Sequence, residues 1–244
     1  LKLDNCVVRG GRLSQAVRCD GNAVAQIEAN NVLWAGGFDS WFQAEGPGPH
    51  ALNLTNCTLL GLQSLAALPE SALSSTGEPS LKLATKDCVF SGAYLNPSSL
   101  FTLKTGSQTA PEAEQFAKAI AWQATDVLLH QMLPKAKGPA KATAIKSLAT
   151  AFNLSADTLF DADPAFRVRP SGAEMQEIEA RDVRVNRRNL KNVSATIGAK
   201  MDELPPTIAA IQERPAETQF ASKPRGLPRI LQVDKKNGPY KSLE

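Results

Sequence analysis

The sequence predicts an all-β fold, a right-handed parallel β-helix with short helical excursions and an extended C-terminal tail. Three observations predict it. A short motif recurs along residues 1–170, an Asn or Asp tends to stand at one place in the motif, and apolar and polar residues alternate before that place. Recurrence of this kind is typical of a solenoid, whose units bury their apolar faces only against their neighbours.

The motif opens with a strand pattern. Leu1 and Leu3 alternate with polar residues, as Leu52 and Leu54 do, so one face of each strand is expected to turn inward. The copies occupy 1–10, 27–36, 52–61, 83–92 and 122–129. Taking Cys6, Val32, Cys57, Cys88 and Val127 as equivalent, the steps between copies are 26, 25, 31 and 39 residues. Two or three short strands fit into each step, as a coil requires.

One polar position recurs directly before these equivalent residues. It holds Asn5, Asn31, Asn56, Asp87 and Asp126. Asn and Asp tolerate the left-handed backbone conformation better than other side chains, so this position predicts a tight bend between two strands.

The combination of an apolar–x–apolar strand, Asn at a bend and a short following strand resembles the right-handed β-helix repeats of the pectin-lyase-like superfamily. The resemblance covers about two thirds of the chain. It implies a fold but little about function, because that superfamily includes lyases, hydrolases, esterases, adhesins and inert spacers. A leucine-rich repeat is the alternative, although such repeats have shorter periods and a helix in each unit.

The chain divides into three predicted parts. A β-helix domain spans 1–170 with a helical insertion around 111–153, and a linker, partly extended or disordered, spans 171–229. Residues 230–244 resemble the start of a second β-helix domain. Since Leu1 already lies inside a repeat, we expect the chain to be a fragment of a larger bacterial multidomain protein.

Catalytic and metal-binding motifs are missing from the sequence. Glycosidase chemistry needs two facing carboxylates, and the outward candidates are Asp4, Asp20, Glu28, Glu45 and Asp87. The Asp-Asp, Gly-His-Gly and Arg-x-Lys motifs of polygalacturonases and the Trp-x-Asp-His motif of pectate lyases do not occur. His50 and His130 lack metal-ligand spacing. We therefore assign no catalytic residue, no metal and no cofactor, and the residues of any binding site stay unknown.

Two further side-chain groups need a structural interpretation. The four cysteines are expected to be free, buried thiols, because neighbouring copies would stack their side chains in parallel. Four aromatic residues suggest either an exposed sugar-stacking strip or packing under a loop. These are Trp34, Trp41, Phe42 and Phe90.

The expected function is a non-catalytic module that acts as a rigid spacer or as a binding surface for a carbohydrate or a partner protein. The alternative is a polysaccharide lyase or glycoside hydrolase with an unfamiliar active site. A net charge of +3 argues against a nucleic-acid partner, and no apolar run is long enough to cross a membrane. We expect a monomer, located outside the cell, on its surface or in the periplasm.

Overall fold

Residues Leu1–Pro205 form one compact unit in the computed structural model. The structure describes residues 1–21, 23–74, 77–93, 98–104, 113–133, 139–155, 157–167, 175, 178–186, 190 and 193–205. The second-domain start predicted at 230–244 lies outside the described residues, as does the predicted linker beyond residue 205. Within the described part of the chain, no helix is long and apolar enough to cross a membrane.

The described secondary structure is mostly β. The strands are β1 (Lys2–Cys19), β2 (Gln26–Ala44), β3 (His50–Thr55), β4 (Thr58–Leu62), β5 (Ser64–Leu68), β6 (Leu81–Gly92), β7 (Ser99–Leu103), β8 (Ile120–His130) and β9 (Leu159–Asp161). The helices are α1 (Glu70–Leu73), α2 (Ala113–Ala119), α3 (Pro139–Ala151) and a short 3₁₀ helix at Ala180–Val183. Every strand pairing among the described residues is parallel.

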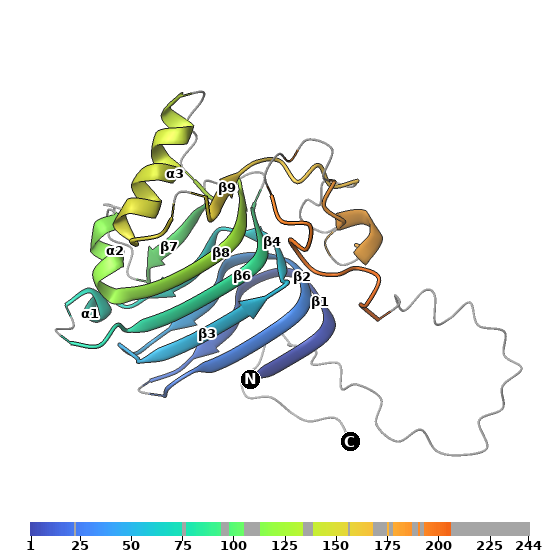
Figure 1. The fold of residues 1–244 in the computed structure, drawn as a ribbon. Helices are drawn as coiled ribbons and strands as arrows, with labels where there is room; N and C mark the ends of the chain where they lie inside the picture. The colour runs from blue at the N-terminus through green and yellow to red at the C-terminus, as the bar shows by residue number, and fades with distance from the viewer. Residues whose placement is uncertain are drawn as a thin grey trace, which may run out of the picture. The chain divides into compact units, whose positions relative to one another are not determined.

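The predicted right-handed β-helix solenoid is wrong. Strands β2 and β6 each pair with both β3 and β4, so β2, β3, β6 and β4 close into a four-stranded parallel barrel to which further strands are added. The physical reason lies at the bends. We expected separate short strands, but β2 and β6 continue without interruption through their bend residues over 19 and 12 residues. Figure 1 shows these long strands stacked on one another.

The equivalences between motif copies are nevertheless confirmed by the strand register. Cys6 pairs with Val32, and Cys88 pairs with Val127. Cys57 directly precedes Thr58, which pairs with both Leu33 and Val89. The bend prediction is also confirmed, because all five bend residues have a φ between 48° and 53°: Asn5, Asn31, Asn56, Asp87 and Asp126. We call these five residues the bend ladder.

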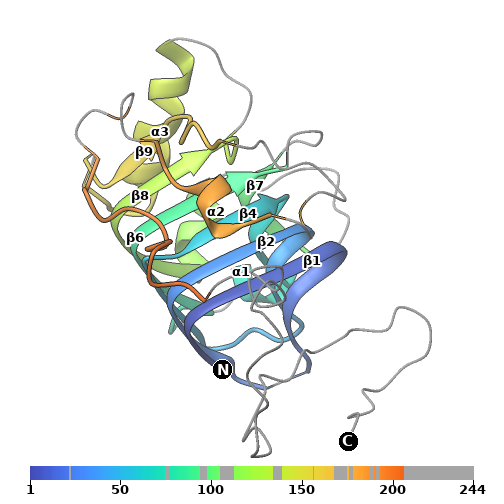
Figure 2. The ribbon, with the colours of Figure 1, turned by 90° about the vertical axis from the view of Figure 1, so that its right-hand side faces the viewer.

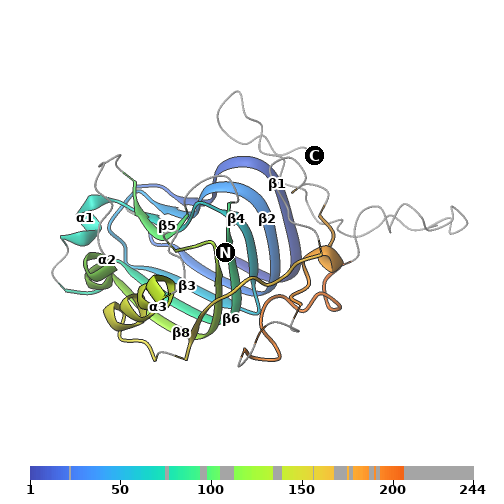
Figure 3. The same cartoon turned by 90° about the horizontal axis from the view of Figure 1, so that it is seen from above.

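The main core fills the space enclosed by the strands (Figure 3). Helix α2 lies at the start of β8 and helix α3 lies beyond β8 (Figure 1). Phe116 on α2 and Phe152 just after α3 add aromatic side chains to this core. The ring of Phe101 lies 5.9 Å from that of Phe116 and 5.4 Å from that of Phe152. Trp122 joins this cluster, and its Nε1 donates a hydrogen bond of 2.9 Å to Thr85 Oγ1. Helix α3 therefore closes the β8 end of the core.

A second apolar cluster lies on the outside of the strands, where the sequence predicted only a linker. Leu33, Leu60, Val89 and Leu128 turn outward from successive strands and pack against described residues from 166 to 204. Ile197, Ala199, Met201 and Leu204 belong to the segment 193–204, which we call the strap. The strap crosses the stacked strands and does not run along them (Figure 2).

Candidate functional site

An open, polar surface covers the outer face of five strands. One row of it contains the residues directly before the bend ladder, namely Asp4, Asn30, Thr55, Lys86 and Thr125. A second row, two residues earlier in each strand, contains Lys2, Glu28, Asn53, Ala84 and Gln123. We call these two rows the polar strip. Their side chains face outward because the residues between the two rows, such as Ala29 and Leu54, point into the core.

Two open depressions lie on the polar strip. The first is lined by Asn53, Leu54, Thr55, Ala84, Thr85, Lys86, Gln123 and Thr125. The second is lined by Lys2, Leu3, Asp4, Glu28, Ala29, Asn30, Asn53 and Thr55. Asn53 and Thr55 line both depressions, so the two form a continuous polar surface. Parallel strands place equivalent side chains about 4.8 Å apart, which gives this surface a regular spacing.

Charge is unevenly distributed along the polar strip. The first depression has one charged side chain, Lys86, among amides and hydroxyls. The second has Asp4 and Glu28 beside Lys2. Asn30 Nδ2 donates a hydrogen bond of 2.7 Å to Asp4 Oδ1, which fixes that carboxylate in place. The first depression is therefore suited to a neutral or anionic polar group.

The bend ladder forms a different surface, and the strap occupies it. Asn56 Nδ2 donates a hydrogen bond of 2.9 Å to the carbonyl of Thr196. The backbone N–H of Lys200 donates one of 2.7 Å to Asn31 Oδ1. Gly198 has a φ of +81°, and a Cβ there would lie 2.9 Å from Thr58 Oγ1, so the close approach requires glycine. Because the strap covers these ladder residues, we place the candidate site on the polar strip.

The five carboxylates proposed from the sequence are distributed over three separate places. Asp4 and Glu28 lie on the polar strip, and Asp87 lies under the strap. Asp20 and Glu45 both bind Arg18, at 2.6 and 3.3 Å. The structure thus brings two pairs of these acids near each other, but it does not assemble all five into one site.

Glu45 is the acid with the most pronounced cationic surroundings. Its carboxylate forms ion pairs with Arg18 and Lys104 and accepts a hydrogen bond of 2.9 Å from Gln43 Nε2. The Glu45 side chain is only 17% exposed. These partners converge because β1, β2 and β7 end close together.

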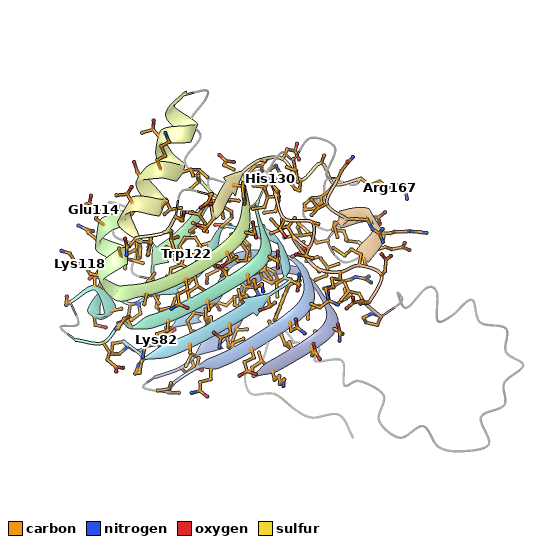
Figure 4. All side chains as sticks on the ribbon, viewed as in Figure 1. Lys82, Glu114, Lys118, Trp122, His130 and Arg167 are labelled. Carbon is orange, nitrogen blue, oxygen red and sulfur yellow. The ribbon has the colours of Figure 1, made fainter. Side chains whose placement is uncertain are left out.

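The sequence reasoning did not foresee that Ser91, His130 and Asp163 lie together. A hydrogen bond of 3.0 Å joins Ser91 Oγ and His130 Nδ1, and His130 Nε2 lies 3.9 Å from Asp163 Oδ1. Figure 4 shows His130 at the end of β8, away from Trp122 at its beginning. Ser91 is only 2% exposed, so its hydroxyl cannot meet a substrate, and the group is best explained as a buried polar pair between β6 and β8.

His50, the other histidine singled out in the sequence, is buried beside Phe42 and is held by hydrogen bonds. The backbone N–H of Ala25 donates a hydrogen bond of 3.2 Å to Nδ1 of His50. The Nε2 atom of His50 lies 3.2 Å from the carbonyl oxygen of Gly46. Among the described residues no group of three or more His, Cys, Asp or Glu side chains is arranged to hold a metal ion.

The hypothesis that four aromatic residues form an exposed sugar-stacking strip is wrong. Trp34, Trp41, Phe42 and Phe90 are buried in the core. The rings of Trp34 and Trp41 pack edge to face at 5.5 Å. By contrast, the prediction that all four cysteines are free is confirmed, and the prediction that they are buried is confirmed for three of them. Cys19, Cys57 and Cys88 are buried and Cys6 is half-buried, and burial raises the pKa of the Cys88 thiol well above its usual value.

No family model, curated protein or solved structure matches the chain. These comparisons therefore give no support to the resemblance to the pectin-lyase-like superfamily. The functional argument rests on the arrangement of the side chains.

Proposed function

We propose that the chain is a non-catalytic binding module whose polar strip holds an extended polysaccharide. The observation that carries the proposal is the regular array of outward amide, hydroxyl and amine groups over five parallel strands. A sugar chain presents hydroxyl groups at repeated intervals, and amide and hydroxyl side chains can both donate and accept hydrogen bonds to them.

The rigid backbone beneath the strip supports this proposal. The strip residues lie on β1, β2, β3, β6 and β8, whose opposite faces are buried in one core. Side chains held on such strands are already placed when the ligand arrives, so less conformational entropy is lost on binding. The same rigidity suits a spacer in a bacterial surface protein, and an extracellular, cell-surface or periplasmic location remains part of the proposal.

A glycan array tests the proposal. We expect the wild-type chain to bind at least one class of polysaccharide, and the triple variant Asn53→Ala, Lys86→Ala, Gln123→Ala to bind it at least 10-fold more weakly. Lys146→Ala, an exposed change on α3, serves as the control and is expected to bind like the wild type. Equal binding by the triple variant and the wild type would reject the polar strip as the site.

Glu45 supports a second candidate function, an enzyme acting on polysaccharides. A carboxylate can take part in proton transfer when it is held in position beside a substrate, and ion pairs with Arg18 and Lys104 hold the carboxylate of Glu45 in position here. Turnover of a bound polysaccharide that Glu45→Gln abolishes without loss of binding would favour this candidate. Binding without turnover favours the non-catalytic module.

A further inference from the structure

The part of the polar strip on β3, β6 and β8 carries charge of one sign. The strand register adds a third row to it, two residues earlier in each strand. The outward positions on these strands are then Ala51, Asn53, Thr55, Lys82, Ala84, Lys86, Ala121, Gln123 and Thr125. Both charged side chains in this set are lysines, and both belong to β6, which lies between β3 and β8.

The first depression follows β6 because a small residue lies between larger ones. Ala84 is flanked in the register by Asn53 on β3 and by Gln123 on β8. In the next row, Lys86 is flanked by the hydroxyl groups of Thr55 and Thr125. The flanking side chains are about 10 Å apart across β6, since two strand spacings separate β3 from β8.

Lys82 and Lys86 mark two ends of this surface. They are four residues apart on one strand, which corresponds to about 13 Å. Figure 4 shows Lys82 near the beginning of β6. Its Nζ lies 3.5 Å from a carboxylate oxygen of Glu78, but the two side chains are 54% and 73% exposed. Because an ion pair this exposed contributes little, Lys82 can exchange it for an acidic group of a ligand.

The positions of the acids decide the direction of the ligand. The acids on β3, β6 and β8 both belong to the bend ladder, where Asp87 is buried under the strap and Asp126 is partly buried. Asp4 and Glu28 line the second depression on β1 and β2. An acidic chain lying across the strands would meet these two carboxylates, whereas one lying along β6 meets a lysine at each end.

The row between the two lysines is uncharged. It consists of Asn53, Ala84 and Gln123. An acidic group placed there would lose water without gaining an opposite charge. A hydroxyl or acetamido group, in contrast, can exchange hydrogen bonds with the two amides. The surface therefore suits a ligand with acidic groups at two places and a neutral group between them.

We propose that the ligand of the polar strip is a polysaccharide in which acidic sugars alternate with neutral ones. It lies along β6, with its acidic groups at Lys82 and Lys86 and a neutral sugar over Ala84. The inference rests on the function proposed above, and it adds the class and the direction of the polysaccharide.

A glycan array with three classes of probe tests the class of ligand. The alternating probes are hyaluronan, whose acidic group is a carboxylate, and keratan sulfate, whose acidic group is a sulfate. Polygalacturonate is the uniformly acidic probe, and hyaluronan with its carboxyl groups reduced to alcohols is the neutral one. We expect an alternating probe to bind about 10-fold more tightly than either of the others, because only it matches both lysines and the uncharged row.

Binding titrations with variants test the direction. Lys82→Gln and Lys86→Gln should each weaken binding of the alternating probe about twofold to fivefold, and together about 10-fold. Ala84→Gln should also weaken it, since a longer side chain fills the space between the lysines without a change of charge. Lys146→Gln, an exposed change on α3, is the control. Circular dichroism establishes that each variant folds.

The outcomes separate this inference from the proposed function. Binding of the neutral or the uniformly acidic probe as tightly as the alternating ones would overturn the inference and leave a polysaccharide-binding module. Loss of affinity in Lys86→Gln but not in Lys82→Gln would overturn the direction along β6. A chain that binds no glycan at all would reject the proposed function itself, and the inference with it.

Discussion

Thr196 Oγ1 donates a hydrogen bond of 2.8 Å to Asp87 Oδ1, although the two residues are 109 positions apart. The backbone N–H of Gly198 also donates to the carbonyl of Asp87, at 2.8 Å. The strap also forms hydrogen bonds with Asn31, through the backbone N–H of Lys200, and with Asn56, through the carbonyl of Thr196. The bend ladder thus has two roles, since it turns the strands and anchors the strap that covers the outer apolar cluster.

Removing the Thr196 hydroxyl should destabilise the chain. Thr196→Ala leaves Asp87, which is 6% exposed, without this donor, and we expect a loss of about 1–2 kcal/mol in the free energy of unfolding. Urea denaturation measures it. Thr196→Ser keeps the hydroxyl and should lose less than half as much. Equal losses in the two variants would show that the hydrogen bond does not anchor the strap.

The positive φ of the bend ladder predicts an unusual order of substitution effects at Asn31. Asn31→Ala should cost about 1–2 kcal/mol in backbone strain at φ 53°, in addition to the lost hydrogen bonds with Asn5 and Lys200. Asn31→Gly loses the same bonds without that strain, although the more flexible unfolded chain of glycine offsets part of the difference. In thermal unfolding, the Asn31→Gly variant should therefore have a higher melting temperature than the Asn31→Ala variant. The reverse order would contradict the strained bend.

Asp126 predicts a dependence of stability on pH. Burial raises its pKa, with Asp87 and Asp157 adding to the effect. A raised pKa in the folded state means that the protonated form favours folding, so this contribution is present below the ordinary value near 3.8 and is lost as the pH rises through the folded pKa.

Asp126→Asn should therefore stabilise the chain at pH 7, by about 0.5 kcal/mol because the carboxylate is largely solvated. Asn also suits the φ of 51° at this position. The stabilisation should disappear near pH 3.5. Denaturation curves at both pH values measure it, and an equal gain at the two values would show that charge is not the cause.

The sequence predicts the parts of the fold that depend on local chemistry. The bend ladder could be found because Asn and Asp are the side chains that tolerate a positive φ, and alternation around Leu52 and Leu54 identified the inward face. The solenoid prediction failed because the motif marks where the strands bend, and a bend does not show whether the strand continues. The unbroken β2 depends on pairing with β3 and β4, which are distant in the sequence.

The candidate site could be predicted from the sequence only in part. Outward positions such as Asp4 and Glu28 follow from alternation, but their assembly with Asn53 and Thr55 depends on the register of three strands. Trp34 and Phe90 were considered for the surface, yet both point inward, and aromatic residue type alone cannot distinguish the two faces of a strand. The strap was missed because its Gly198 and Thr196 act through contacts with β4 and β6, not through a repeat.

Nuclear magnetic resonance of the side-chain amides tests the central claim, binding at the polar strip, most directly. A polysaccharide selected on the glycan array is titrated into the ¹⁵N-labelled chain. We predict that the Asn53 and Gln123 amide signals shift with one common affinity, whereas the Gln43 signal beside Glu45 does not change. Shifts at Gln43 with none at Asn53 and Gln123 would contradict the account and move the site to Glu45.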